Sequence, residues 1–198
     1  MATPRSLCFA SNNAHKVAEI QALLGPGYHL QGLADFGITE DIPETQATLE
    51  GNSLQKAAYV FERYQVPVFA DDTGLEVDAL NGEPGVYSAR YAGASRDNQA
   101  NLQKVLDNLQ GQTNRAAQFR TVITLILPSG QPHAFEGIAR GHLLTEPMGE
   151  QGFGYDPIFV PEGHTRTFAQ MSATEKNELS HRGRAVRKLV DFLLTTEW

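Results

Sequence analysis

The spacing of apolar and polar residues in the first third of the chain predicts strands separated by helices. Residues 7–10 and 66–70 are short apolar runs with the length of a buried strand, and residues 28–33 form a third, weaker run. Residues 17–24 and 48–64 instead carry apolar side chains at three- and four-residue spacing, which is typical of amphipathic helices. The expected order is therefore strand, helix, strand, helix, strand.

The middle of the chain predicts one more helix and a pair of strands. Residues 96–109 have an amphipathic helical pattern, and residues 118–127 alternate as a long strand does. A turn rich in Pro and Gly at residues 128–132 leads to a returning strand over residues 133–140. We place a soft boundary between two lobes near Gly111, within a single domain that spans the chain.

The C-terminal tail predicts two helices with a break between them. The sequence Ser-Ala-Thr-Glu, which begins at Ser172, has the spacing of a capping box, so a helical turn is expected to start there. In one unbroken helix, Lys176, His181 and Arg182 would point in divergent directions. A break at Ser180 removes this conflict, because the last two of these residues then lie in the first turn of a final helix.

Composition places the chain among ordinary globular proteins. It has 198 residues, 41% hydrophobic and 20% charged, which allows one substantial core or two lobes that share one. The longest apolar run is too short to cross a bilayer, and the N-terminus lacks the apolar core of an export signal. The formal net charge of −7 argues against general affinity for nucleic acid. The single cysteine, Cys8, excludes an intramolecular disulfide, fits a reducing cytoplasm and is expected to be buried.

Two adjacent carboxylates, Asp71 and Asp72, follow the apolar run 66–70. Thr73 and Gly74 come next, and the four residues together have the chemistry of a turn. Because adjacent residues of an extended chain point to opposite faces, we expect one carboxylate to face a site and the other to hold the turn. A carboxylate at the carboxyl end of a buried strand suits Mg²⁺. An ordinary acidic turn is the alternative interpretation.

A polar loop connects the first strand to the first helix. Its residues are Ser11, Asn12, Asn13, Ala14, His15 and Lys16. Backbone N–H groups at a helix N-terminus can receive phosphate, and the lysine adds a positive charge. The loop lacks the G-x-x-x-x-G-K-[ST] pattern of a P-loop, and plain helix capping explains the same residues.

A second cluster of candidate residues lies in the glycine-rich run 149–159. Glycines on both sides of Phe153 allow the backbone to approach a ligand closely. Phe153 and Tyr155 offer planar surfaces that can stack on a base, and Asp156 can accept hydrogen bonds from a base or a sugar. The alternative is a hairpin whose aromatic side chains pack into the core.

Four separated motifs resemble, in order, the signature of the inosine triphosphate pyrophosphatase family, which hydrolyses non-canonical purine nucleoside triphosphates. They are the Ser-Asn-Asn-Ala-His-Lys loop, the run 67–93 with its Pro-Gly-Val-Tyr-Ser-Ala-Arg sequence, the Gly-Phe-Gly-Tyr-Asp-Pro-Ile-Phe string, and Ser-His-Arg-Gly near the C-terminus. The resemblance implies an α/β protein with a mixed twisted sheet and two lobes around a central nucleotide-binding cleft, commonly a homodimer. It also implies cleavage between the α- and β-phosphates of ITP, dITP or XTP, which yields the monophosphate and pyrophosphate.

The resemblance also implies roles for individual residues. Asp72 is the best candidate for the general base and, with Glu44, for the ligands of Mg²⁺. The expected substrate contacts are Ser11, Asn12, Asn13, Ala14, His15, Lys16, Lys56, Thr73, Phe153, Gly154, Tyr155, Asp156, Lys176, His181 and Arg182. Without the resemblance, Glu44 and Lys56 are interpreted as an exposed glutamate and a solvated lysine. Donors from His181, Arg182 and the loop 153–156 would select 6-oxo purines by meeting O6.

Two other functions fit parts of the same pattern. One is a related pyrophosphatase that acts on modified pyrimidine triphosphates. The other is a non-catalytic module that binds a nucleotide or RNA through the aromatic loop without turnover. The negative net charge and the adjacent aspartates speak against the binding module.

Overall fold

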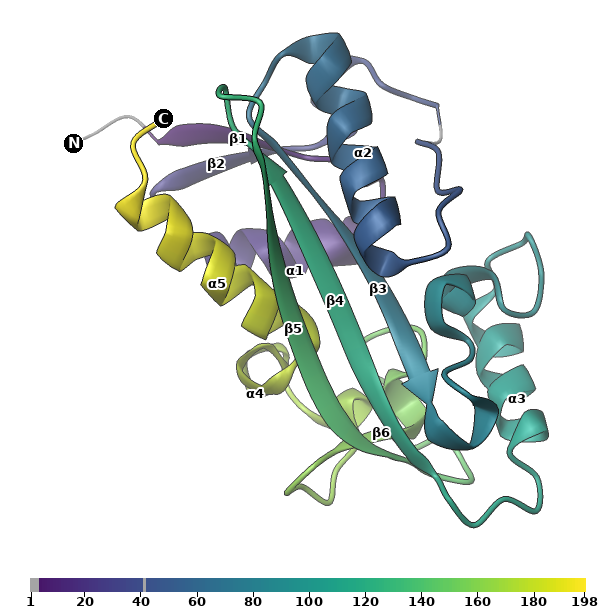
Figure 1. Cartoon of the computed structure of the whole chain (residues 1–198). Coiled ribbons are helices and arrows are strands. Elements are labelled where there is room, and N and C mark those ends of the chain that lie inside the picture. The colour runs from purple at the N-terminus through teal and green to yellow at the C-terminus, as the bar shows by residue number, and fades with distance from the viewer. Residues whose placement is uncertain (1–3, 41) are drawn as a thin grey trace. The chain divides into compact units, whose positions relative to one another are not determined.

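Strands and helices follow one another along the chain in the computed structural model, which describes residues 4–40 and 42–198 (Figure 1). The strands are β1 (Arg5–Phe9), β2 (Tyr28–Gln31), β3 (Val68–Val77), β4 (Ala116–Ile126), β5 (Pro132–Leu143) and β6 (Phe159–Pro161). The helices are α1 (Ala14–Leu24), α2 (Leu49–Tyr64), α3 (Asn98–Asn108), α4 (Ala173–Leu179) and α5 (His181–Thr195). The mixed α/β fold class is confirmed.

The chain divides into two compact units, each assembled from separate stretches. Unit 1 consists of the chain up to Asp72, Thr121–Gly137 and the chain from Arg182 onward. Unit 2 consists of Thr73–Arg120 and Ile138–His181. The chain passes from one unit to the other inside β3, β4 and β5 and after the first residue of α5. The loop near residue 111, where we placed a soft boundary between lobes, lies within unit 2. That the whole chain forms one domain stays a prediction.

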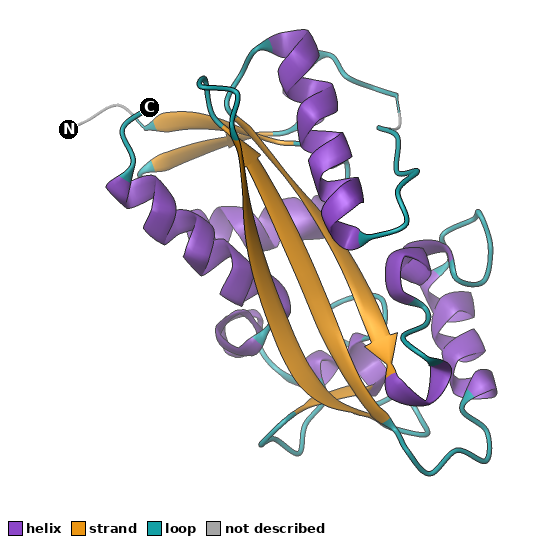
Figure 2. Cartoon of the chain, viewed as in Figure 1, coloured by secondary structure: helices purple, strands orange, loops and turns teal. Residues whose placement is uncertain are grey.

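The strands hydrogen-bond in the order β2-β1-β3-β4-β5-β6 (Figure 2). β1 runs parallel to β2, with Arg5 opposite Tyr28, and parallel to β3, with Phe9 opposite Phe69. β6 runs antiparallel to β5. The sheet is therefore mixed, as the resemblance implied.

Helices cover both faces of the sheet in unit 1. Phe9 and Phe69 pack with apolar residues of α1 and α5 in one buried cluster, and the two rings stack with centroids 4.8 Å apart. Their neighbours Cys8 and Val68 belong to a second buried cluster, together with apolar residues of α2. Because neighbouring strand residues point to opposite faces, α1 and α5 cover one face and α2 covers the other (Figure 1).

This arrangement makes the carboxyl end of β1, with the part of β3 next to it, the expected ligand site of unit 1. α1 connects β1 to β2 on one face, and α2 connects β2 to β3 on the other face. The chain thus passes from β1 through α1 to β2 on one side of β1, and then through α2 to β3 on the other side of β1. β1 and β3 are neighbouring parallel strands at the point where the strand order reverses. Open α/β sheets bind their ligands beyond the carboxyl ends of the strands at such a point.

Aromatic side chains dominate the core of unit 2. Phe119 of β4 lies edge-on to Phe159 with 4.8 Å between ring centroids, and it stacks on Phe168 at 6.2 Å. α3 adds Leu102 and Val105 to the same buried cluster. This packing fixes β6 and the 3₁₀ turn that precedes it (Asp156–Ile158).

The turn that we predicted at Asp71 and Asp72 is wrong. β3 continues through both aspartates and ends at Val77. Gly74 serves a close backbone approach and not a turn, because an added Cβ would lie 2.6 Å from the carbonyl oxygen of Gly85. Both aspartate side chains also have partners on helices, described below, so they are not needed to cap a local turn.

The two predicted helices of the tail are present. α4 begins at a capping box in which Ser172 and Glu175 exchange hydrogen bonds between side chain and backbone. α4 ends at Leu179, and the extended backbone of Ser180 (ψ 154°) separates it from α5. The predicted break at this serine is confirmed.

Two further predictions concern burial and membranes. Cys8 is 1% exposed, and burial raises the pKa of its thiol to about 12, so it is an inert core residue. Across the part of the chain that the structure describes, no helix combines the length and the hydrophobicity that a membrane span requires.

Candidate active site

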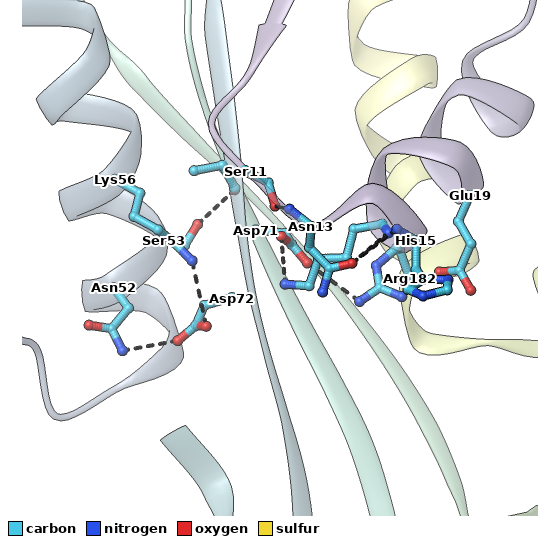
Figure 3. Close-up of polar contacts among 12 residues, drawn as sticks. Ser11, Asn13, His15, Glu19, Asn52, Ser53, Lys56, Asp71, Asp72 and Arg182 are labelled. Atoms are coloured by element: carbon cyan, nitrogen blue, oxygen red, sulfur yellow. Dashed lines mark hydrogen bonds and ion pairs between the residues drawn. The ribbon is translucent and has the colours of Figure 1, made fainter. Parts of the chain in front are cut away.

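Asp71 and Asp72 lie on opposite faces of β3, just beyond the point where β3 pairs with the last residue of β1 (Figure 3). Asp71 contacts side chains of α1 and α5, whereas Asp72 contacts side chains of α2. Both are buried, with 1% and 8% of their surface exposed. The alternation that we predicted for these neighbours is confirmed, and each carboxylate is the centre of its own polar cluster.

The Asp71 cluster joins two cations from opposite ends of the chain. Lys16 of α1 places its Nζ 2.9 Å from Asp71 Oδ1, and Arg182 of α5 places its Nη2 3.6 Å from Asp71 Oδ2. The Nη1 atom of Arg182 also donates to Glu19 Oε2 at 2.5 Å. Lys16 and Arg182, both predicted substrate contacts, are thus brought together on one buried carboxylate.

The Asp72 cluster brings together the two predicted metal ligands. The Nζ atom of Lys56 lies 2.6 Å from Glu44 Oε1 and 3.7 Å from Asp72 Oδ1. Asn52, one turn earlier on α2, donates from Nδ2 to Asp72 Oδ2 at 3.0 Å. Lys56 is buried, so the interpretation as a solvated lysine does not hold.

The two aspartates differ in acidity for physical reasons. Burial alone would raise the pKa of Asp71, but Lys16, Arg182 and Lys56 outweigh it and hold that pKa below its usual range. Burial raises the pKa of Asp72, and the opposing effects of Lys56, Lys16 and the Asn52 hydrogen bond do not cancel this increase. Asp71 is therefore a permanent counter-ion, and Asp72 is the better proton acceptor.

The two lysines are perturbed in opposite directions. Burial lowers the pKa of Lys16, and Asp71 only partly compensates. Burial would also lower the pKa of Lys56, but Asp72 and Glu44 outweigh it and raise the pKa. Lys56 thus remains an ammonium ion, held by two carboxylates that converge on it.

That convergence shows that the site fits a cation. The Lys56 ammonium takes the position of a small cation between Glu44 and Asp72. Among the described residues, no three side chains of the His, Cys, Asp and Glu types form a metal-binding group. Two carboxylates leave the remaining coordination to water and substrate, which is how Mg²⁺ is commonly bound next to phosphates.

The loop 11–16 is organised by Asn13, the N-cap of α1. Its Oδ1 accepts hydrogen bonds from the backbone N–H groups of His15 and Lys16, at 3.0 and 3.2 Å, and Ser11 Oγ accepts from Asn13 N at 3.2 Å. The cap fixes the first turn of α1 and hence the position of Lys16 next to β3. Asn12 and Ala14, which take no part in this cap, are exposed.

The glycine-rich loop of unit 2 holds Phe153, Asp156 and Lys176 together. Asp156 Oδ2 accepts from Phe153 N and from Lys176 Nζ, both at 2.8 Å, and the lysine Nζ lies 5.0 Å from the centre of the Phe153 ring. Gly152 is required at its position, because an added Cβ would lie 2.1 Å from Asp156 Oδ2. Gly154 also has a positive φ of 64°.

Tyr155 and His181 are built into the core of unit 2. Tyr155 is 5% exposed, its hydroxyl donates to Ser88 O at 2.7 Å, and burial raises its pKa. His181 is 3% exposed, and its ring stacks on Phe119 with centroids 4.6 Å apart. The core-packing alternative therefore describes Tyr155, while Phe153 stays half-buried.

Sequence reasoning left three participants of the unit 1 clusters without a site role. Glu19 pairs with Arg182, Asn52 binds Asp72, and Asp71 binds two cations. A partial signal existed for two of them, because Glu19 and Asn52 lie three and four residues from Lys16 and Lys56 in their helices.

Thr73 is half-buried and is the first residue of unit 2. That it contacts the substrate stays a prediction, as it does for the other residues expected to bind substrate.

Comparison with known proteins agrees with the four motifs. The model of the Ham1 family matches residues 7–192. The dITP/XTP pyrophosphatase of Flavobacterium psychrophilum is 54% identical over 94% of this chain and 97% of its own, and that of Porphyromonas gingivalis is 52% identical over 95% and 97%. The solved structure of a HAM1 protein from Coxiella burnetii has a TM-score of 0.89 and 38% identity, and the match covers 97% of this chain and all of that one. The chain therefore belongs to the Ham1 family.

Proposed function

We propose that the protein hydrolyses the non-canonical purine nucleoside triphosphates ITP, dITP and XTP to the nucleoside monophosphate and pyrophosphate, and so removes them from the nucleotide pool. The observation that carries the proposal is the convergence of Glu44 and Asp72 on one cation, Lys56, in the middle of the strand β3. The names of the relatives, dITP/XTP pyrophosphatases, support dITP and XTP as substrates.

Glu44 and Asp72 would hold a Mg²⁺ ion in this function. The ion supplies positive charge where negative charge develops on the phosphate oxygens. Lys56, an ammonium held by the same two carboxylates, would be available to donate to a phosphate oxygen.

Asp72 acts as general base toward the attacking water. Burial raises the pKa of its carboxyl, which makes it a stronger proton acceptor than an exposed aspartate. Asn52 donates to one carboxylate oxygen, Oδ2, which leaves Oδ1 facing Lys56. No Ser-His-Asp or Cys-His order in the sequence recommends a covalent intermediate, so direct attack by water is the simpler route.

Lys16 and Arg182 hold the phosphate chain. Both are fixed by Asp71, and each can exchange part of that ion pair for a phosphate oxygen as charge moves toward the leaving pyrophosphate. The Asn13 cap keeps Lys16 at the start of α1 during this exchange.

Phe153, Asp156 and Lys176 are suited to the nucleoside. The Phe153 ring offers a stacking face, and the Asp156–Lys176 pair offers an acceptor and a donor. Donors of this loop, with that of His181, would favour the O6 carbonyl of inosine and xanthosine over the amino group of adenosine. We place the reaction in the cytoplasm and expect a homodimer, which size-exclusion chromatography with light scattering would test.

A substrate panel tests the proposed function. Pyrophosphate release is measured for ITP, dITP, XTP, dGTP, ATP and a modified pyrimidine triphosphate, with Mg²⁺ and with a chelator. We expect turnover of the first three with Mg²⁺, little with ATP and none with the chelator. Equal rates for ITP and ATP would contradict the selectivity, and a preference for the pyrimidine would contradict the substrate class.

A further inference from the structure

Asn52 is a buried polar residue of α2 whose two hydrogen bonds join the parts of the metal site. It is 1% exposed. Its Nδ2 donates to Asp72 Oδ2 at 3.0 Å, and its Oδ1 accepts from the backbone N–H of Gln46 at 2.9 Å (Figure 3 shows the first bond). One amide group therefore contacts both β3 and the loop that carries Glu44.

The loop 44–46 lies directly on the first turns of α2. Thr45 N donates to Gln55 Oε1, and Gln55 Nε2 donates back to Thr45 Oγ1, both at 2.9 Å. Gly51 makes room for this contact, because an added Cβ would lie 2.7 Å from the Cβ of Gln46. The loop is thus held in the position from which Glu44 reaches Lys56.

Asn52 differs from its neighbour Ser53, which is a purely structural tether. Ser53 Oγ donates to Ala70 O at 3.1 Å and to Thr124 Oγ1 at 2.7 Å. These bonds tie α2 to β3 and β4 without a contact to Glu44 or Asp72. The two adjacent residues therefore allow a positioning role to be separated from a structural one.

We propose that Asn52 is a positioning residue that fixes Asp72 and, through Gln46, the Glu44 loop at the separation needed for one divalent cation. This inference rests on the proposed function. With the amide in place, Asp72 cannot rotate its Oδ2 into the site, and Glu44 cannot move away with its loop. Groups that orient metal ligands in this way typically contribute about 10- to 100-fold to metal affinity or activity.

The test compares Asn52→Ala with Gln55→Ala and Ser53→Ala. Three quantities are measured for the full-length protein: Mn²⁺ affinity without nucleotide by calorimetry, kcat and KM for dITP, and the melting temperature. For Asn52→Ala we expect about 10- to 100-fold weaker Mn²⁺ binding and a similar fall in kcat, with a smaller change in KM. Gln55→Ala removes only the second loop tether, so its Mn²⁺ affinity should fall less. Ser53→Ala should lower only the melting temperature.

A second variant, Asn52→Asp, separates the two hydrogen bonds. The carboxylate can still accept from Gln46 N but cannot donate to Asp72. If the bond to Asp72 matters, kcat of this variant falls at least as far as that of Asn52→Ala. Recovery of the original kcat would overturn this half of the proposal.

The remaining outcomes also decide the question. If Asn52→Ala retains Mn²⁺ affinity and kcat within twofold while its melting temperature falls like that of Ser53→Ala, Asn52 is only structural and the proposal is overturned. Failure of the unchanged protein to bind Mn²⁺ at millimolar concentration also overturns it. If the unchanged protein binds Mn²⁺ but does not hydrolyse dITP, the proposed function fails, and the calorimetric comparison of the variants still decides the role of Asn52.

Discussion

The polar clusters of unit 1 and the loop group of unit 2 are built in different ways. In unit 1, cations and carboxylates from distant parts of the chain neutralise one another. These side chains are Lys16, Lys56, Arg182, Glu19, Glu44, Asp71 and Asp72. In unit 2, one local ion pair, Asp156 with Lys176, supports an aromatic ring and a backbone N–H.

This difference indicates what each group can bind. In the unit 1 clusters the cations are already paired with carboxylates, so a phosphate chain can bind there only if ion pairs are exchanged. In unit 2 the groups present a flat face and directed hydrogen bonds, which suit an uncharged base. In the proposed function, unit 1 would therefore bind the charged phosphates, and the loop group of unit 2 would bind the base.

The largest effect is expected for Asp72→Asn. The amide cannot accept a proton, so kcat for dITP should fall by about 10²- to 10⁴-fold. The variant loses one partner of the buried Lys56 ammonium but keeps the pair with Glu44, so its melting temperature should fall less than that of Asp71→Asn. A large loss of stability would contradict the assignment of Asp72 to catalysis.

Asp71→Asn should show the opposite behaviour. Removing the charge leaves Lys16 and Arg182 buried without this counter-ion, which should cost about 3–5 kcal/mol of unfolding free energy. Urea denaturation measures this cost. If the variant is as stable as the unchanged protein, the Asp71 cluster does not hold the cations together.

The pH dependence of stability sharpens the contrast between the two aspartates. The pKa of Asp71 is lower in the folded chain than in the unfolded one, so its charge stabilises the fold above the unfolded pKa, and this contribution is lost as the pH falls. The difference in unfolding free energy between the unchanged protein and Asp71→Asn should be constant above about pH 5 and should shrink below about pH 4. If this difference in unfolding free energy grew as the pH fell, folding would raise the pKa of Asp71 and not lower it.

In unit 2, Phe153→Ala tests the proposed stacking face. Loss of one stacked ring typically costs about 1–3 kcal/mol, so KM for ITP should rise about 10-fold or more while kcat changes less. Tyr155→Phe is the matched control, because it removes only the hydroxyl that donates to Ser88 O. That control should lower stability without affecting KM. An unchanged KM in Phe153→Ala would remove this residue from the binding site.

The smallest effect is expected for Ser172→Ala. The change removes the side-chain cap of α4, which carries Lys176, and should cost about 1 kcal/mol. For a chain of this size that corresponds to a fall of about 2–4 °C in melting temperature. Calorimetry checks the shift, and KM for ITP should rise at most a few-fold. If the melting temperature fell further in Ser172→Ala than in Asp71→Asn, the order of these two effects would be wrong.

The sequence predicted best what local chemistry determines. The capping box at Ser172 and the break at Ser180 were both readable from a few residues, because caps depend on neighbours in the chain. The opposite orientation of Asp71 and Asp72 follows from the geometry of an extended chain alone. The two metal-ligand candidates required the family resemblance, since Glu44 lies in a loop without a pattern of its own.

Features that depend on distant partners could not be predicted in this way. β3 passes through Asp71 and Asp72 because helices supply partners for both side chains and Gly85 approaches Gly74, and none of these contacts has a local signal. The pair His181 and Arg182 looked like one functional group. In the fold, the histidine stacks on aromatic rings of unit 2, whereas the arginine joins the Asp71 cluster of unit 1.

Product analysis of a single reaction tests the central claim most directly. dITP and Mg²⁺ are incubated with the protein and followed by phosphorus NMR. We expect dIMP and pyrophosphate in equal amounts, with no intermediate dIDP. Release of dIDP and phosphate, or no turnover at all, would contradict it.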